Sequence, residues 1–158
     1  MNTTTNNPPF SETDAKAIDH CNSLLRGEIS AVETYGQAID KFSEEPEVVI
    51  LKAIRDDHRR AVTYLTDRIH GLHGLADTSS GAWGATTKAI QATANFFGED
   101  SAIRSLEQGE ELGQQAYESA INDPDLDEET RLIVRDRLLP MVNQHITRLQ
   151  TLTESLSQ

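Results

Sequence analysis

Four stretches of this chain carry apolar residues at alternating spacings of three and four, the pattern of helices that each bury one face. Each apolar stripe is interrupted once, near its middle, by an ionisable residue. A charge in an apolar core is costly unless it is paired or bound to a metal, so these interruptions constrain both fold and function. The four residues are Glu28, His58, Glu110 and His145.

The stripes predict an all-α fold with four long helices, over about residues 11–42, 46–72, 100–122 and 127–156. Ser11 is expected to cap the first helix and Asp125 or Asp127 the last, while Pro140 should kink the last helix or loosen one turn. A shorter helical pattern, roughly Trp83 to Phe97, lies in a crossover of about 25 residues. Two hairpins joined in this way predict a ferritin-like four-helix bundle over residues 11–158, after a disordered tail over 1–10.

Composition limits the partners of the protein. The formal net charge is −12, which argues against nucleic acid and anionic membranes, because both demand clustered basic surface. No segment reaches the ~18 apolar residues of a membrane span, and the first ten residues do not form a signal peptide. The single cysteine, Cys21, falls on the first apolar stripe and is expected in the core. These features predict a cytoplasmic protein, whose helix faces could also support a homo-oligomer.

An internal repeat relates the two halves of the chain. Shifting residues 23–39 by 82 positions gives seven identities, where chance would give about one. The shift superimposes Glu28 on Glu110 and Tyr35 on Tyr117, and a weaker match places His58 on His145. The repeat therefore makes the two glutamates equivalent, and their places in the stripes are not accidental.

Two hypotheses account for two glutamates and two histidines in one core. Imidazole and carboxylate together suit Fe, Zn or Mn, and two glutamates with one divalent ion sum to zero charge. The four interrupting residues would then be the ligands of one metal ion. Two Glu–His ion pairs also sum to zero, so the alternative is a metal-free network that only fixes helix packing. The sequence leaves both hypotheses open and does not decide whether the protein is an enzyme.

Other residues could support the site. Tyr35 and Tyr117 lie two turns after the glutamates and could donate to a carboxylate, although core packing with a satisfied hydroxyl is favoured. Glu107 and Glu111 flank Glu110 and could serve as auxiliary ligands, but such residues usually form a solvated face. Asp56, Asp57, Arg59 and Arg60 read as an exposed charged face, and Gly27 and Gly109 as points of close helix approach.

The Gly-Glu pairs at 27–28 and 109–110 and the Gly-Ala-Trp-Gly segment at 81–84 resemble an uncharacterised bacterial branch of the ferritin-like superfamily. The resemblance covers about residues 15–152 and implies a ferritin-like four-helix bundle, with a role in metal handling or stress response. It carries no established activity.

Better-known members of that superfamily, such as rubrerythrin and bacterioferritin, hold two irons with a Glu from each of two helices and a Glu-x-x-His from each of the other two. The four interrupting residues match this pattern. The two remaining glutamate positions hold Arg55 and Val142, which cannot serve as carboxylate ligands. The resemblance therefore disfavours a di-iron oxidase or peroxidase centre, unless Glu107, Glu111 or Glu33 substitutes.

Overall fold

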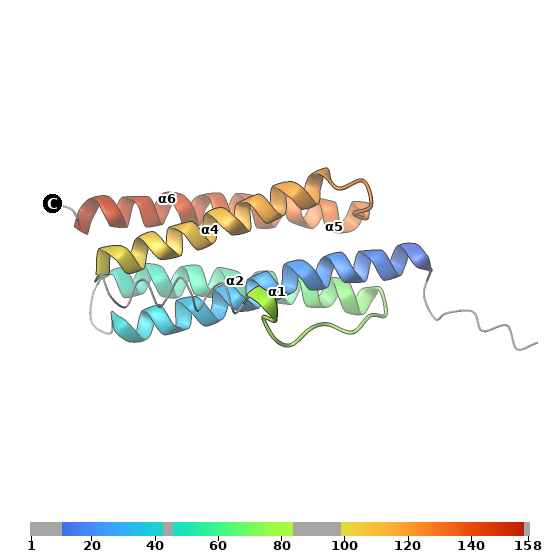
Figure 1. The fold of residues 1–158 in the computed structure, drawn as a ribbon, viewed down its shortest axis with the longest axis horizontal. Coiled ribbons are helices and arrows are strands. Elements are labelled where there is room, and N and C mark those ends of the chain that lie inside the picture. Colours follow the sequence, from blue (N-terminus) through green and yellow to red (C-terminus); the bar gives the residue numbers. More distant parts are fainter. Residues whose placement is uncertain (1–10, 43–45, 84–98, 157–158) are drawn as a thin grey trace, which may run out of the picture.

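A computed structural model describes residues 11–42, 46–83 and 99–156, and this part of the chain is helical with no strand. The first hairpin pairs α1 with α2, and the second pairs α4 with a last helix built from three consecutive segments (Figure 1). The elements are α1 (Glu12–Lys41), α2 (Glu47–Gly71), α4 (Glu99–Asn122), α5 (Glu128–Ile133), η1 (Val134–Leu138) and α6 (Leu139–Leu156).

The helix ends follow the capping signals in the sequence. The Ser11 side chain accepts a hydrogen bond from the backbone N–H of Asp14 at 3.0 Å, and Asp127 accepts from Thr130 at 3.0 Å. Both predicted caps are therefore confirmed, with Asp127 rather than Asp125 in the second case. The predicted helix between Trp83 and Phe97 lies, beyond Trp83, outside the described residues, as does the tail over 1–10.

The directions of the long helices follow from the ends at which they begin and stop. In Figure 1, α2 ends at one end of the bundle and α4 begins at the other, so α1 and α4 run in opposite directions. The main contacts lie within each hairpin, while α1 against α4 and α2 against α6 make fewer. Among the described residues, no helix has both the length and the apolar composition needed to cross a lipid bilayer.

The apolar core is divided into two clusters along the bundle. Each long helix contributes to both clusters, and in each helix the predicted ionisable residue falls between its two contributions. The polar layer therefore crosses the bundle at one level. One cluster contains Tyr35, Ile39, Phe42, Val48, Leu51, Ile54, Ile103, Leu106, Leu149 and Leu152, and the other contains Cys21, Leu25, Ala61, Leu65, Ile69, Tyr117, Val134, Leu138 and Val142.

The last helix contains the predicted disturbance as a π-helical turn. Pro140 has no N–H, and in a regular α-helix its ring would clash with the carbonyl four residues before it. The helix is therefore wider over η1, where the N–H of Leu139 bonds to the carbonyl of Val134, five residues earlier. Buried Val134, Leu138 and Val142 follow one another at spacings of four. In a regular α-helix such steps would drift by about 40° each, and the wider turns keep them on the core face.

The second helix ends at Gly71, close to the predicted end near residue 72, and the residue with left-handed backbone after it is His73, not a glycine. His73 takes the left-handed conformation with a φ of 60°, and the N–H of Gly74 bonds to the carbonyl of Ile69. Gly74 instead allows close packing, because a Cβ atom there would lie 2.8 Å from side-chain atoms of Ile18.

This packing predicts opposite effects for two glycine substitutions. Gly74→Ala should destabilise the protein by about 1–3 kcal/mol, because the β-branched Ile18 side chain has little freedom to move aside. Gly36→Ala should be neutral or stabilise by up to about 1 kcal/mol, because Gly36 lies inside α1 and a Cβ there meets no atom within 4 Å in the part of the chain that the structure describes. Urea unfolding of both variants measures the difference, and equal effects would contradict the packing argument.

Candidate metal centre

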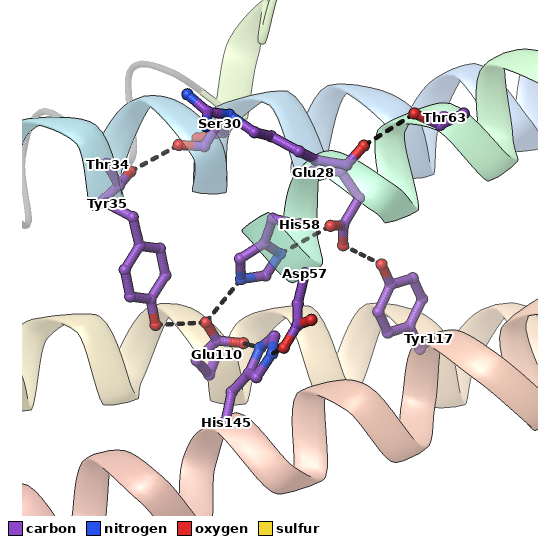
Figure 2. Close-up of polar contacts among 11 residues, drawn as sticks. Glu28, Ser30, Thr34, Tyr35, Asp57, His58, Thr63, Glu110, Tyr117 and His145 are labelled. Carbon is purple, nitrogen blue, oxygen red and sulfur yellow. Dashed lines mark hydrogen bonds and ion pairs between the residues drawn. The ribbon is translucent and has the colours of Figure 1, made fainter. Parts of the chain in front are cut away.

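The four ionisable residues predicted from the apolar stripes meet in one buried layer, one from each long helix (Figure 2). None of them is more than 5 % exposed. At this depth an unpaired charge would be strongly destabilising, so the contacts of each residue decide what the layer can do.

The two glutamates are each held by a tyrosine from the other half of the repeat. The hydroxyl of Tyr35 on α1 donates to Oε1 of Glu110 on α4 at 2.6 Å, and the hydroxyl of Tyr117 on α4 donates to Oε1 of Glu28 on α1 (Figure 2). Burial and the neighbouring carboxylates raise the pKa of both tyrosines well above the usual value, so they remain donors. The hydroxyls thus bind carboxylates and do more than fill the core.

His58 bridges the two glutamates. Its Nδ1 lies 2.8 Å from Oε2 of Glu28, and its Nε2 lies 2.9 Å from Oε1 of Glu110. Burial opposes a charge on the ring, but the two carboxylates outweigh it and raise the pKa of His58 to about 10. For Glu110, burial is likewise outweighed by His58 and His145, which hold the pKa of its carboxyl far below the usual range.

His145 shares Glu110 with His58 and reaches a residue that the sequence did not indicate. Its Nδ1 lies 3.3 Å from Oε2 of Glu110, and its Nε2 lies 3.1 Å from Oδ2 of Asp57. Asp57 was interpreted as part of an exposed face, but its side chain is only 14 % exposed because it turns toward α6 and His145. Asp57 also pairs with Arg60 on its outer side. That interpretation was wrong for Asp57, since a position flanking the stripe can still face a neighbouring helix.

The layer alternates acidic and basic groups. The carboxylates of Glu28, Asp57 and Glu110 contact the two imidazoles, and Arg60 pairs with Asp57 on its outer side. The two imidazole rings lie only 4.9 Å apart between centroids, however, so two protonated rings would repel each other with Glu110 as their shared partner.

Three residues of the layer have donor atoms close enough to share one ion. His58, Glu110 and His145 each offer one ligand atom, and these atoms lie within 4.8 Å of one another. Glu28, the fourth predicted ligand, contacts the opposite nitrogen of His58. The structure therefore brings all four predicted residues together. Three of them could share one ion, and Glu28 contacts this set from outside through His58.

The predicted auxiliary glutamates lie elsewhere in this structure. Glu107 accepts a hydrogen bond from Gln150 at 2.9 Å, Glu111 is exposed, and Glu33 accepts from Ser80 at 2.9 Å. The two positions that depart from the di-iron pattern hold Val142, which is buried, and Arg55, whose Nε lies 3.8 Å from Asp56. No additional carboxylate is thus supplied to the layer from these positions.

A cleft of about 270 Å³ lies between α1 and α4 and reaches the buried layer. Gly27 and Gly109 line it, and neither marks the close helix approach expected from the sequence. A Cβ on Gly27 would lie 3.7 Å from the ring of Trp83, while a Cβ on Gly109 would meet no atom of the described residues within 4 Å. Trp83 therefore packs against α1.

Fold and site together define an all-helical protein with a buried layer of glutamate, histidine and tyrosine. The chain belongs to the family described as Domain of unknown function (DUF2383), which it matches over residues 16–123. This range includes Glu28, His58 and Glu110 but ends before α5, so His145 lies outside it. No curated protein and no solved structure matches the chain.

Removal of a buried tyrosine hydroxyl should be costly. Tyr35→Phe removes one of the three partners of the buried Glu110 carboxylate and should destabilise the protein by about 1–3 kcal/mol. Tyr64→Phe is the matched control, because Tyr64 is 37 % exposed and its hydroxyl only accepts a long contact from Arg137, so its effect should stay within about 0.5 kcal/mol. Thermal and urea unfolding compare the two, and equal losses would argue against the buried contact.

The raised pKa of His58 predicts how stability depends on pH. A pKa raised from 6.5 to about 10 contributes stability that is fully present below pH 6.5 and is lost as pH rises through about 10. Urea unfolding in EDTA should therefore show a falling free energy of unfolding across this interval. In His58→Gln the fall should be much smaller, and a flat profile in the wild-type protein would contradict the ion-pair geometry.

Proposed function

We propose that this protein is a ferritin-like helical bundle that binds one divalent metal ion through His58, Glu110 and His145. The observation that carries the proposal is the convergence of their three donor atoms within 4.8 Å in a buried layer. Two imidazoles and one carboxylate suit Fe, Zn or Mn, the metals favoured by the sequence. The antiparallel α1 and α4 and the long connection between the hairpins support the ferritin-like relationship.

The hydrogen bonds assign a role to each ring nitrogen. On each histidine one nitrogen faces Glu110, and this is the atom that would bind the ion: Nε2 of His58 and Nδ1 of His145. The other nitrogen faces an outer carboxylate, Glu28 or Asp57 respectively. Such carboxylate–histidine pairs fix the ring orientation and raise ligand basicity in metal sites. Glu28 and Asp57 would therefore position the ligands.

The charge of the layer fits the exchange of protons for an ion. One divalent ion replaces the protons on the two histidines without changing the net charge, so Glu110, Glu28 and Asp57 remain balanced with Arg60. The proposal ends at metal binding, in metal handling or stress response, because Arg55 and Val142 occupy the positions of two carboxylates that a di-iron centre requires.

For partners and cellular compartment, we keep the proposals made from the sequence. The charge of −12 supports the absence of nucleic acid and anionic membrane partners, and the buried free thiol of Cys21 suits the cytoplasm.

Metal content after supplementation with Fe, Zn and Mn tests the proposal. The wild-type protein, purified without chelator, should retain close to one ion per chain, and less than about 0.1 ion per chain would reject metal binding. At a free metal concentration of about 100 times Kd, binding should also raise the free energy of unfolding by about 2.7 kcal/mol.

Three isosteric substitutions separate ligands from positioning residues. Glu110→Gln should abolish binding, because its carboxylate is the only one in the set of three. Glu28→Gln should weaken binding by about 10- to 100-fold, as is typical of an outer partner of a ligating histidine. Glu111→Gln removes the same charge from the exposed neighbouring position and should leave binding unchanged. Equal losses in all three variants would indicate a general charge effect.

The second candidate function is a metal-free structural or interaction module. It is favoured by the fact that each ring nitrogen of the two histidines already has a carboxylate partner. Both ring nitrogens of His58 and of His145 already lie opposite carboxylate oxygens. Under this alternative Glu110→Gln lowers stability, whereas neither Fe, Zn nor Mn raises the melting temperature of the wild-type protein.

A further inference from the structure

The cleft between α1 and α4 reaches the proposed metal site and extends beyond it, toward residues that metal binding does not use. It lies where the two hairpins meet, and its floor is formed by the inner faces of Glu28, Glu110 and His58. The aromatic rings of Tyr35 and Tyr117 cross between α1 and α4 at either side of this floor (Figure 2). The cleft is therefore an open space whose floor consists of buried polar side chains.

Two glycines on α4 leave space in the cleft. Among the described residues, a Cβ atom built on Gly109 or Gly113 meets no atom within 4 Å, although glycine inside a helix costs about 1 kcal/mol relative to alanine. Both residues line the cleft. A larger side chain at either position would therefore occupy cleft space.

The lining of the cleft combines small and apolar side chains with carboxylates and aromatic rings. Carboxylates of Glu28, Glu110 and Asp123 line it together with two imidazoles: His58 contacts both glutamates, and His20 lies 3.4 Å from Asp123. The described part of the lining contains no lysine or arginine. Of the aromatic residues, the single tryptophan of the chain, Trp83, and two of its three tyrosines also line this cleft. Faces of Trp and Tyr attract organic cations, and carboxylates strengthen that attraction.

We propose that the cleft binds a small organic cation, an amine with a short apolar body. The ammonium group would lie near the carboxylates and ring faces at the floor, and the apolar body would lie along the small side chains of α1 and α4. A volume of about 270 Å³ is below that of most drug-sized pockets and limits the ligand to a few carbon atoms. An anion is disfavoured because three carboxylates line the cleft against two imidazoles, and a neutral ligand lacks the charge that this excess of carboxylates attracts.

Trp83 gives a direct measurement, because it is the only tryptophan and lines the cleft. Its fluorescence, excited selectively in metal-free protein, is titrated with butylamine, butanol and butyrate, which share one carbon chain. We expect saturable changes with butylamine, binding about tenfold weaker with butanol, and none with butyrate. Equal response to butylamine and butanol, or preference for butyrate, overturns the proposal.

A matched pair of leucine substitutions locates the binding. Gly109→Leu fills the cleft and should weaken butylamine binding at least about tenfold, while the helix remains intact because leucine is a better helix former than glycine. Gly36→Leu makes the same change on α1 at a position outside the cleft lining, and binding should be unchanged. Unchanged binding in Gly109→Leu, with circular dichroism showing a folded protein, refutes the location. Because metal is absent throughout, failure of the metal proposal leaves this test intact.

Discussion

The compensation of buried carboxylates by buried imidazoles is the constraint on which the rest of the bundle depends. Glu110 has three partners, Tyr35, His58 and His145, and each comes from a different helix. Moving any of these three helices by one residue would remove a partner of the buried Glu110 carboxylate, at a cost of about 1–3 kcal/mol. Apolar contacts tolerate small shifts far better. The polar layer therefore fixes the register of the helices, while the apolar clusters on both sides supply most of the burial.

The repeat explains the layer, and its one departure from symmetry explains the three-residue set. The tyrosines cross between the halves, and each histidine places Nδ1 on the glutamate of its own half. Symmetry would then place Nε2 of His145 on Glu28, but Asp57 takes this nitrogen. The equivalent of Asp57 in the second half is Gln144, which is exposed. Glu110 therefore serves two histidines, and Glu28 serves one.

Periodicity was sufficient to predict the helices and the members of the layer, because a helix that buries one face brings its interrupting residues to the core. The caps at Ser11 and Asp127 could also be read from the sequence. Contacts across helices could not. Asp57 lies beside the stripe, and its burial depends on the position of α6, while the open space at Gly109 depends on how α1 and α4 separate. Such features are set by the packing of whole helices, and one stripe carries no information about its neighbour.

The geometry of the layer is compatible with protons on the two histidines or with one bound divalent ion. The distance between the two imidazole rings makes the electrostatic energy of these two states different. Two protonated imidazoles with centroids 4.9 Å apart repel each other, and Glu110 alone lies between them. Under the metal proposal, a single divalent ion would carry the same charge but attract both rings, each of which would keep its outer N–H directed at Glu28 or Asp57. Two attractive contacts would then replace the repulsion between two protonated rings. Asp57, which the sequence did not reveal, is the residue that would orient His145 as a ligand.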